Sequence, residues 1–191
     1  QQFGKNRTVH WVGTSMGGVI GMMLAAHPTQ RRFIDRLVLN DIGPEVPDEA
    51  LERIREYTSQ APRFADYPSA RAYLEGIYAP FGELSEPEWQ TMQMHSWRRD
   101  SDGSLVPHYD PAILARFAEP QNKPLAWTLF SSIMSPILVI RGTQSDILTE
   151  TIAQQMAESA LRVTRLEVPN AGHAPFLNTG SQVSEIKKFL S

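Results

Sequence analysis

The chain has 191 residues, of which 41% are hydrophobic and 20% charged, and its formal net charge is -3. This composition is typical of a globular protein with enough apolar residues for a core, and the small charge gives no general attraction to nucleic acid or anionic lipid. The absence of cysteine excludes disulfides, thiolate metal sites and a cysteine nucleophile. No apolar run approaches the roughly 20 residues that a membrane span needs, so we expect neither a nucleic-acid nor a membrane partner.

The first residues, 1–7, contain no initiator methionine and no secretory signal pattern, and they lead almost directly into a strand. We therefore expect the natural start of the protein to lie upstream. The compartment stays open, with the cytoplasm as the default.

The first elements alternate strand, helix and strand. Residues 8–12 are a β-branched and aromatic run that Gly13 ends, which predicts a buried strand. Residues 16–27 form an almost wholly apolar helix that ends before Pro28, and residues 36–40 predict a second strand. Two strands joined by a helix make a βαβ unit, in which the strands run parallel.

The middle of the chain, residues 45–134, has helical patterns and no strong strand signal. The patterns predict helices over 47–58, 69–78, 85–97, 111–117 and 125–133. Asp102 and Gly103 indicate a tight turn between two of these helices. We interpret this segment as an inserted helical layer.

The βα alternation returns in the last third of the chain. The sequence predicts strands over 137–140 and 165–168, and helices over 149–161 and 183–190. The fold class is therefore α/β, with a mostly parallel sheet flanked by helices. Residues 1–44 and 135–191 would form this core, and residues 45–134 would form the insertion.

The turn after the first strand carries a G-x-S-x-G motif, Gly13-Thr14-Ser15-Met16-Gly17. The motif lies between a predicted strand and a predicted helix, which is the context of a nucleophile elbow. The glycines at both ends would leave room for this sharp turn. Ser15 would then lie at a helix N-terminus, where the backbone N–H of Met16 could stabilise developing negative charge.

Two later loops carry an acidic residue and a histidine that could act together with the serine motif. The segments Ile140-Arg141-Gly142-Thr143-Gln144-Ser145-Asp146 and Val168-Pro169-Asn170-Ala171-Gly172-His173 each run from a predicted strand into a loop. With the serine motif they resemble the α/β-hydrolase family, whose catalytic triad follows the chain order Ser, acid, His. This resemblance implies Ser15 as nucleophile, His173 as base and Asp146 as acid.

Asp41 is an alternative acid. It also follows a predicted strand, and some members of the family take their acid from this earlier position. A plain loop carboxylate before Gly43 and Pro44 is the other interpretation of Asp41. We expect Asp146 to be the acid and keep Asp41 as its rival.

The resemblance has further implications. Residues 45–134 would form a cap over the site, in which Trp97, Tyr109 and Trp127 could line a substrate pocket or form the cap's own core. Strands that precede the elbow in this family, and the loop that gives the second oxyanion N–H, are missing from this chain. Without them the first strand would present an unpaired edge that favours self-association.

The function that these expectations favour is a serine hydrolase that cleaves a carboxylic ester or related acyl compound through an acyl-enzyme, without cofactor or metal. The same fold also hosts lactonases, hydrolases of carbon-carbon bonds and acyltransferases. A binding protein or an inactive fragment that keeps the fold without turnover is the alternative from another class.

Overall fold

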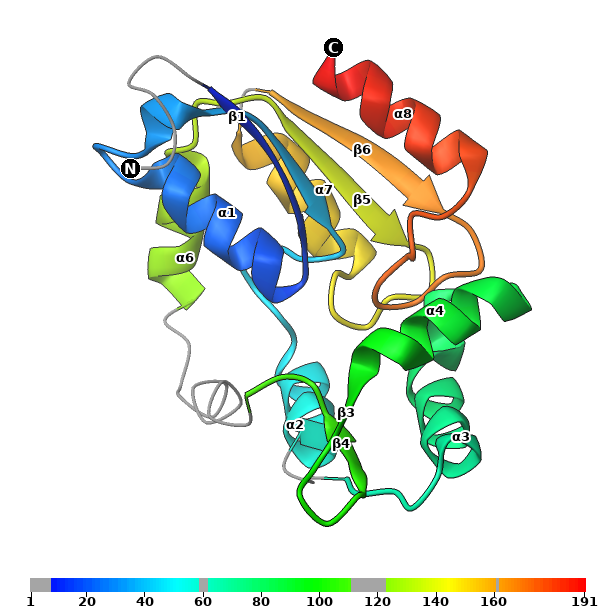
Figure 1. The fold of residues 1–191 in the computed structure, drawn as a ribbon. Helices are drawn as coiled ribbons and strands as arrows, with labels where there is room; N and C mark the ends of the chain where they lie inside the picture. Colours follow the sequence, from blue (N-terminus) through cyan, green and yellow to red (C-terminus); the bar gives the residue numbers. More distant parts are fainter. Residues whose placement is uncertain (1–7, 59–61, 111–122, 161) are drawn as a thin grey trace. The chain divides into compact units, whose positions relative to one another are not determined.

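A computed structural model describes residues 8–58, 62–110, 123–160 and 162–191 (Figure 1). The helix expected over 111–117 lies outside these residues. The chain divides into two compact units, Gln1–Pro47 with Asn122–Ser191, and Asp48–Gln121. Each unit is described by itself.

The first unit is built on a four-stranded parallel sheet with the order β1-β2-β5-β6. Its strands are β1 (Val9–Thr14), β2 (Ile34–Asn40), β5 (Ile137–Gly142) and β6 (Val163–Val168). All four strands were expected, and the parallel α/β class is confirmed. Because the strands are parallel, the loops that follow them emerge at one edge of the sheet.

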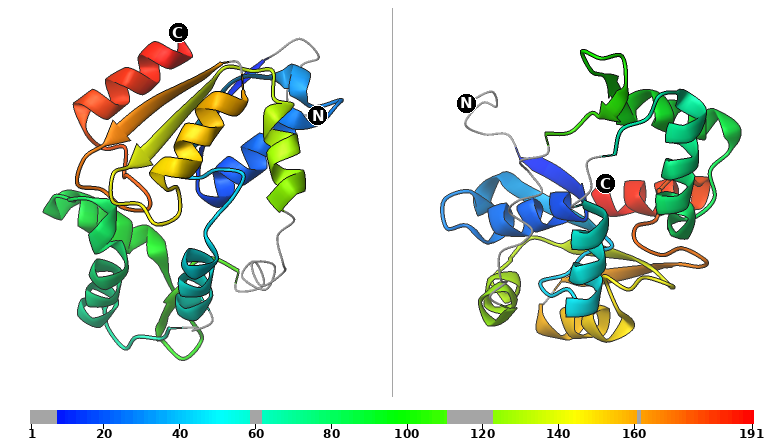
Figure 2. Two further views of the ribbon diagram at one scale, coloured as in Figure 1. Left: turned by 180° about the vertical axis from the view of Figure 1, so that it is seen from behind. Right: turned by 90° about the horizontal axis from the view of Figure 1, so that it is seen from below.

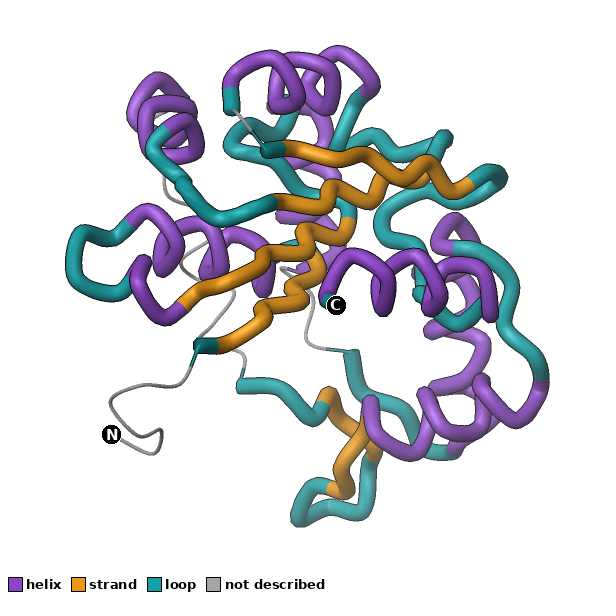
Figure 3. The backbone as a smooth tube through the Cα atoms, turned by 90° about the horizontal axis from the view of Figure 1, so that it is seen from above, coloured by secondary structure: helices purple, strands orange, loops and turns teal. Residues whose placement is uncertain are grey.

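Helices cover both faces of this sheet: α1 (Met16–Ala26), α6 (Lys123–Ser131), α7 (Glu150–Ser159) and α8 (Gly180–Leu190). Close contact of α1 with β2 is possible because Gly18 and Gly21 lie against Leu39 and Leu37. The opposite face holds Val38, which belongs to a buried cluster packed by side chains of α8. Figure 3 shows the C-terminal helix on one side of the strands and other helices of the unit on the opposite side.

The sequence placed residues 125–133 in the insertion, but α6 belongs to the first unit because it packs against α1. The described part of the second unit holds α2 (Asp48–Thr58), α3 (Tyr67–Tyr78) and α4 (Glu86–Ser96). All three helices were expected, within two residues at each end.

A β-hairpin in the second unit corrects the expectation of helices alone. Strands β3 (Trp97–Arg99) and β4 (Leu105–Pro107) pair antiparallel, and Asp102 and Gly103 lie in the turn between them, not between helices. Gly103 has φ of 84°, a conformation that glycine adopts without strain. Strands of three residues are too short to show the alternation by which a strand is predicted.

Strand β1 lies at the end of the strand order (Figure 2). Large apolar side chains are exposed on β1 and on α1. Val12 is 47% exposed, and on α1 Ile20 and Met23 are 41% and 58% exposed. Self-association through this edge stays a prediction. Among the described residues, no helix is both long and apolar enough to cross a membrane.

Candidate active site

Ser15 stands at the sharp turn that joins β1 to α1. It is the N-cap of α1 with φ of 49° and ψ of -118°, and its backbone N–H donates to the carbonyl of Asn40 at 3.1 Å. A positive φ is uncommon for a residue with a side chain, and such strain is frequent at functional sites. The turn leaves the side chain of Ser15 half-buried at the sheet edge where the loops converge.

The glycines of the elbow have unequal roles. A Cβ atom on Gly13 would overlap the carbonyl group of Gly17, so this position requires glycine. A Cβ atom on Gly18 would overlap the side chain of Ile42. Gly17 itself would meet nothing within 4 Å among the described residues, so the expected steric need at Gly17 is not supported.

His173 lies in the loop after β6 and is 9% exposed. Its Nε2 atom lies 3.1 Å from Ser15 Oγ, although 158 positions separate the two residues in the chain. A buried amide holds this arrangement, because Asn40 Nδ2 donates to the Pro175 carbonyl at 2.9 Å and to Thr14 Oγ1 at 3.0 Å. Asn40 thus ties the loop of His173 to the end of β1.

The carboxylate on the other side of the imidazole is Asp41. Its Oδ2 atom lies 2.8 Å from His173 Nδ1, and Asp41 is fully buried at the end of β2. An ionised carboxylate only accepts hydrogen bonds, so the proton of the neutral imidazole sits on Nδ1 and the lone pair on Nε2 faces Ser15. This is the tautomer in which His173 can accept the serine proton.

The preference for Asp146 over Asp41 is therefore corrected. Asp146 is exposed, whereas the hydrogen bond at His173 Nδ1 is made by Asp41. The physical reason is the path of the loop after β6, which is fastened to Asn40, the residue directly before Asp41. His173 is thereby placed beside the end of β2.

Two further groups hold the Asp41 carboxylate, and neither was singled out from the sequence. The Gly142 backbone N–H donates to Oδ1 at 2.8 Å, and Ser145 Oγ donates to Oδ2 at 2.5 Å. A buried carboxylate needs such donors, because burial without them is costly. Ser145 stands directly before Asp146. Small polar residues are common in loops after strands, so the sequence alone does not indicate that Ser145 contacts the acid.

Met16 is the first residue of α1, so its backbone N–H has no acceptor within the helix. This N–H and the positive end of the helix dipole lie beside Ser15. The role of the Met16 N–H as an oxyanion donor stays a prediction.

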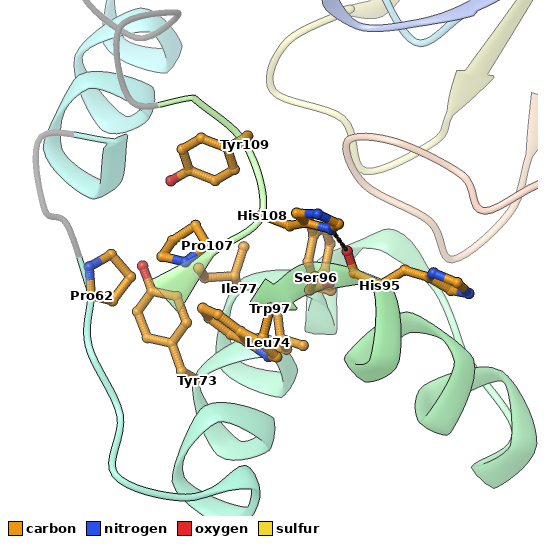
Figure 4. A pocket seen from close by; sticks show the side chains of 11 residues that line it. Pro62, Tyr73, Leu74, Ile77, His95, Ser96, Trp97, Pro107, His108 and Tyr109 are labelled. Carbon is orange, nitrogen blue, oxygen red and sulfur yellow. Dashed lines mark hydrogen bonds between the residues drawn. The ribbon is translucent and has the colours of Figure 1, made fainter. Parts of the chain in front are cut away.

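The three residues expected at a substrate pocket do not come together in one unit. Trp97 and Tyr109 line a cavity of about 400 Å³ within the second unit, and the side chain of Tyr73 also lines it (Figure 4). Trp97 is 7% exposed and packs edge-on against Phe64, so it also serves the core of this unit. Trp127 lies on α6 in the first unit, where its indole N–H donates to Glu45 at 2.9 Å.

The cavity in the second unit is apolar enough to affect its tyrosines. Burial raises the pKa of Tyr73 and that of Tyr78, and the neighbouring Tyr109 adds to both effects. These hydroxyls therefore remain protonated donors. Within the described residues no group of three His, Asp or Glu side chains could hold a metal ion.

Comparisons with known proteins identify the family of this chain. The model of the alpha/beta hydrolase family matches residues 1–186. The 3-hydroxybutyrate-oligomer hydrolase of Cupriavidus necator is 34% identical over 96% of this chain and 65% of its own length. An alpha/beta hydrolase from Novosphingobium aromaticivorans, also 34% identical, superposes with a TM-score of 0.80 over 94% of this chain and 64% of its own.

A crystal structure of a hydrolase from Rickettsia typhi is 33% identical, with a TM-score of 0.86 over 96% of this chain and 62% of its own. The chain thus spans slightly less than two thirds of the length of these relatives. Similarity of this extent to a family model and to curated and solved relatives leaves no doubt about ancestry. The chain belongs to the alpha/beta hydrolase family.

Proposed function

We propose that this chain carries the catalytic triad of a serine hydrolase that cleaves carboxylic esters through an acyl-enzyme. The observation that supports the proposal is the unbroken series of contacts from Ser15 Oγ to His173 Nε2 and from His173 Nδ1 to Asp41 Oδ2. A serine hydroxyl becomes an effective nucleophile when a neutral imidazole accepts its proton and a buried carboxylate orients that imidazole.

In the first half of the reaction Ser15 Oγ attacks the ester carbonyl carbon while its proton moves to His173 Nε2. Asp41 stabilises the imidazolium that forms, and the tetrahedral oxyanion accepts a hydrogen bond from the Met16 N–H. His173 then gives its proton to the leaving alkoxide, and the acyl-enzyme forms. Water, activated by the same imidazole, attacks the acyl carbon and releases the acid and Ser15.

The first substrate class to test is the short oligomer of 3-hydroxybutyrate, because a relative 34% identical to this chain is named for its hydrolysis. These molecules are carboxylic esters, which fits the triad proposed above. The cavity with Trp97 and Tyr109 lies in the unit that we propose as the cap. Its apolar walls and tyrosine hydroxyls suit an aliphatic ester with carbonyl acceptors.

The test measures release of 3-hydroxybutyrate from its dimer and trimer, with p-nitrophenyl acetate as a general ester. We expect turnover that Ser15→Ala lowers by about 10^6-fold, the loss typical for the nucleophile of such a triad. A binding protein would instead show no turnover and equal affinity for the oligomer in both forms. That result would overturn the proposed hydrolase activity.

A further inference from the structure

The loop after β5 brings a second serine to the buried carboxylate. Ser145 is 8% exposed, and its hydroxyl lies 2.5 Å from Asp41 Oδ2, the same oxygen that contacts His173 Nδ1. The two serines thus stand at opposite ends of one series of hydrogen bonds, which runs from Ser15 through the imidazole and the carboxylate to Ser145.

The direction of the Ser145 hydroxyl is fixed by its other contacts. The backbone N–H groups of Ile147 and Leu148 lie 3.2 and 3.1 Å from Ser145 Oγ, and an N–H can only donate. A hydroxyl has one proton and two lone pairs. With the lone pairs facing these two donors, the single proton points at Asp41 Oδ2.

The loop that presents this hydroxyl is itself anchored. Arg141 Nε donates to the Leu148 carbonyl at 3.0 Å, and Arg141 Nη1 pairs with Glu167 of β6 at 2.5 Å. The backbone of Gln144 donates to the Ala171 carbonyl at 2.9 Å, which joins this loop to the loop of His173. The donor is therefore held in place before any substrate binds.

We infer that Ser145 is a positioning residue, which sets the rotation of the Asp41 carboxylate and through it the orientation of His173. With the Gly142 N–H on Oδ1 and the Ser145 hydroxyl on Oδ2, the carboxylate plane has one favoured rotation. In this rotamer Oδ2 already faces His173 Nδ1. The inference rests on the proposed function, since it assigns a role within the same triad.

The experiment follows the modification of Ser15 by a fluorophosphonate with intact-mass analysis. The dependence of the rate on reagent concentration gives the second-order rate constant and separates reversible binding from the bond-forming step. Ser145→Ala is expected to slow the bond-forming step roughly 10- to 100-fold, the effect of one hydrogen bond to a charged group. Reversible binding of the reagent is expected to stay unchanged. Ser145→Thr, which keeps a hydroxyl, is expected to restore most of the rate.

A matched control removes another hydroxyl of the same unit. The half-buried Ser135 donates to the Ile34 carbonyl at 2.7 Å, at the start of β5 and not at its catalytic end. Ser135→Ala is expected to keep the rate within about twofold. Thermal unfolding shows whether each variant folds, and Ser145→Cys, a weaker donor in the same place, replaces Ser145→Ala if the latter does not fold.

A double-mutant cycle separates positioning from a general loss of structure. If Ser145 acts through the carboxylate, Ser145→Ala adds less than about twofold to the effect of Asp41→Asn. A full, additive effect in the Asp41→Asn background, or a normal rate for Ser145→Ala alone, overturns the inference and leaves the proposed function intact. Absence of labelling in the unmodified chain overturns the proposed function, and the inference with it.

Discussion

Replacement of the two candidate acids, Asp41→Asn and Asp146→Asn, gives a sharp contrast. An asparagine at position 41 keeps one oxygen, which the Gly142 N–H at 2.8 Å holds at Oδ1, so its NH2 group faces His173 Nδ1. The imidazole then carries its proton on Nε2 and cannot accept the proton of Ser15. In a triad this wrong tautomer lowers kcat by about 10,000-fold, or about 5.4 kcal/mol in activation free energy.

Asp146 is exposed, and its replacement by asparagine removes a surface charge. A change of that kind usually alters free energies by no more than about 0.5 kcal/mol, so we expect activity within about twofold. The assay is the initial rate on p-nitrophenyl acetate, with thermal unfolding as the control for folding. A loss of several orders of magnitude in Asp146→Asn with near-normal activity in Asp41→Asn would refute the assignment of Asp41 as acid.

Three other predictions concern stability and the supports of the site. Gly13→Ala is expected to destabilise the protein by about 1–3 kcal/mol in urea unfolding, because its Cβ overlaps the carbonyl of Gly17. Gly17→Ala is the control, because its Cβ would meet no atom of the described residues within 4 Å. Equal effects of the two substitutions would contradict the geometry. Asn40→Ala removes the hydrogen bond to the Pro175 carbonyl and is expected to lower the free energy of unfolding by about 1–3 kcal/mol. It is also expected to slow the labelling of Ser15 by a fluorophosphonate. Unchanged stability and labelling rate would show that this hydrogen bond is dispensable. The Ser104 hydroxyl is the main cause that lowers the pKa of Asp102 from its ordinary value of 3.8. The contribution of Asp102 to stability is therefore present above that pH and is lost as the pH falls below about 4. Asp102→Asn should flatten the dependence of the unfolding temperature on pH in that range, and an unchanged slope would contradict this prediction.

The sheet and its helices were predictable because their signals are local. The strand β5 is buried along its whole length, and its first four residues, 137–140, form an unbroken apolar run. Helix α1 follows a recognisable elbow motif. The hairpin of β3 and β4 escaped prediction for the opposite reason. Its strands are too short for any periodicity. Phe64, from a distant part of the sequence, adds a bridge to Leu105 of β4.

The choice of acid could not be made from the sequence, because both carboxylates follow parallel strands and reach the same edge of the sheet. What separates them is the course of the loop that carries His173. That course is fixed by the hydrogen bond from Asn40 to Pro175, which joins residues 135 positions apart. A contact between residues so far apart in the sequence leaves no local pattern. The same holds for the hydrogen bond from the Ser145 hydroxyl to Asp41.

The most direct test of the central proposal is the identity of the nucleophile. The chain is incubated with a fluorophosphonate, its intact mass is measured, and the modified residue is located by peptide mapping, with Ser15→Ala as the control. If the contacts among Ser15, His173 and Asp41 form a working triad, one adduct forms on Ser15 and is absent from the variant. A folded chain that gives no adduct, or an adduct that persists in Ser15→Ala, would contradict the proposal.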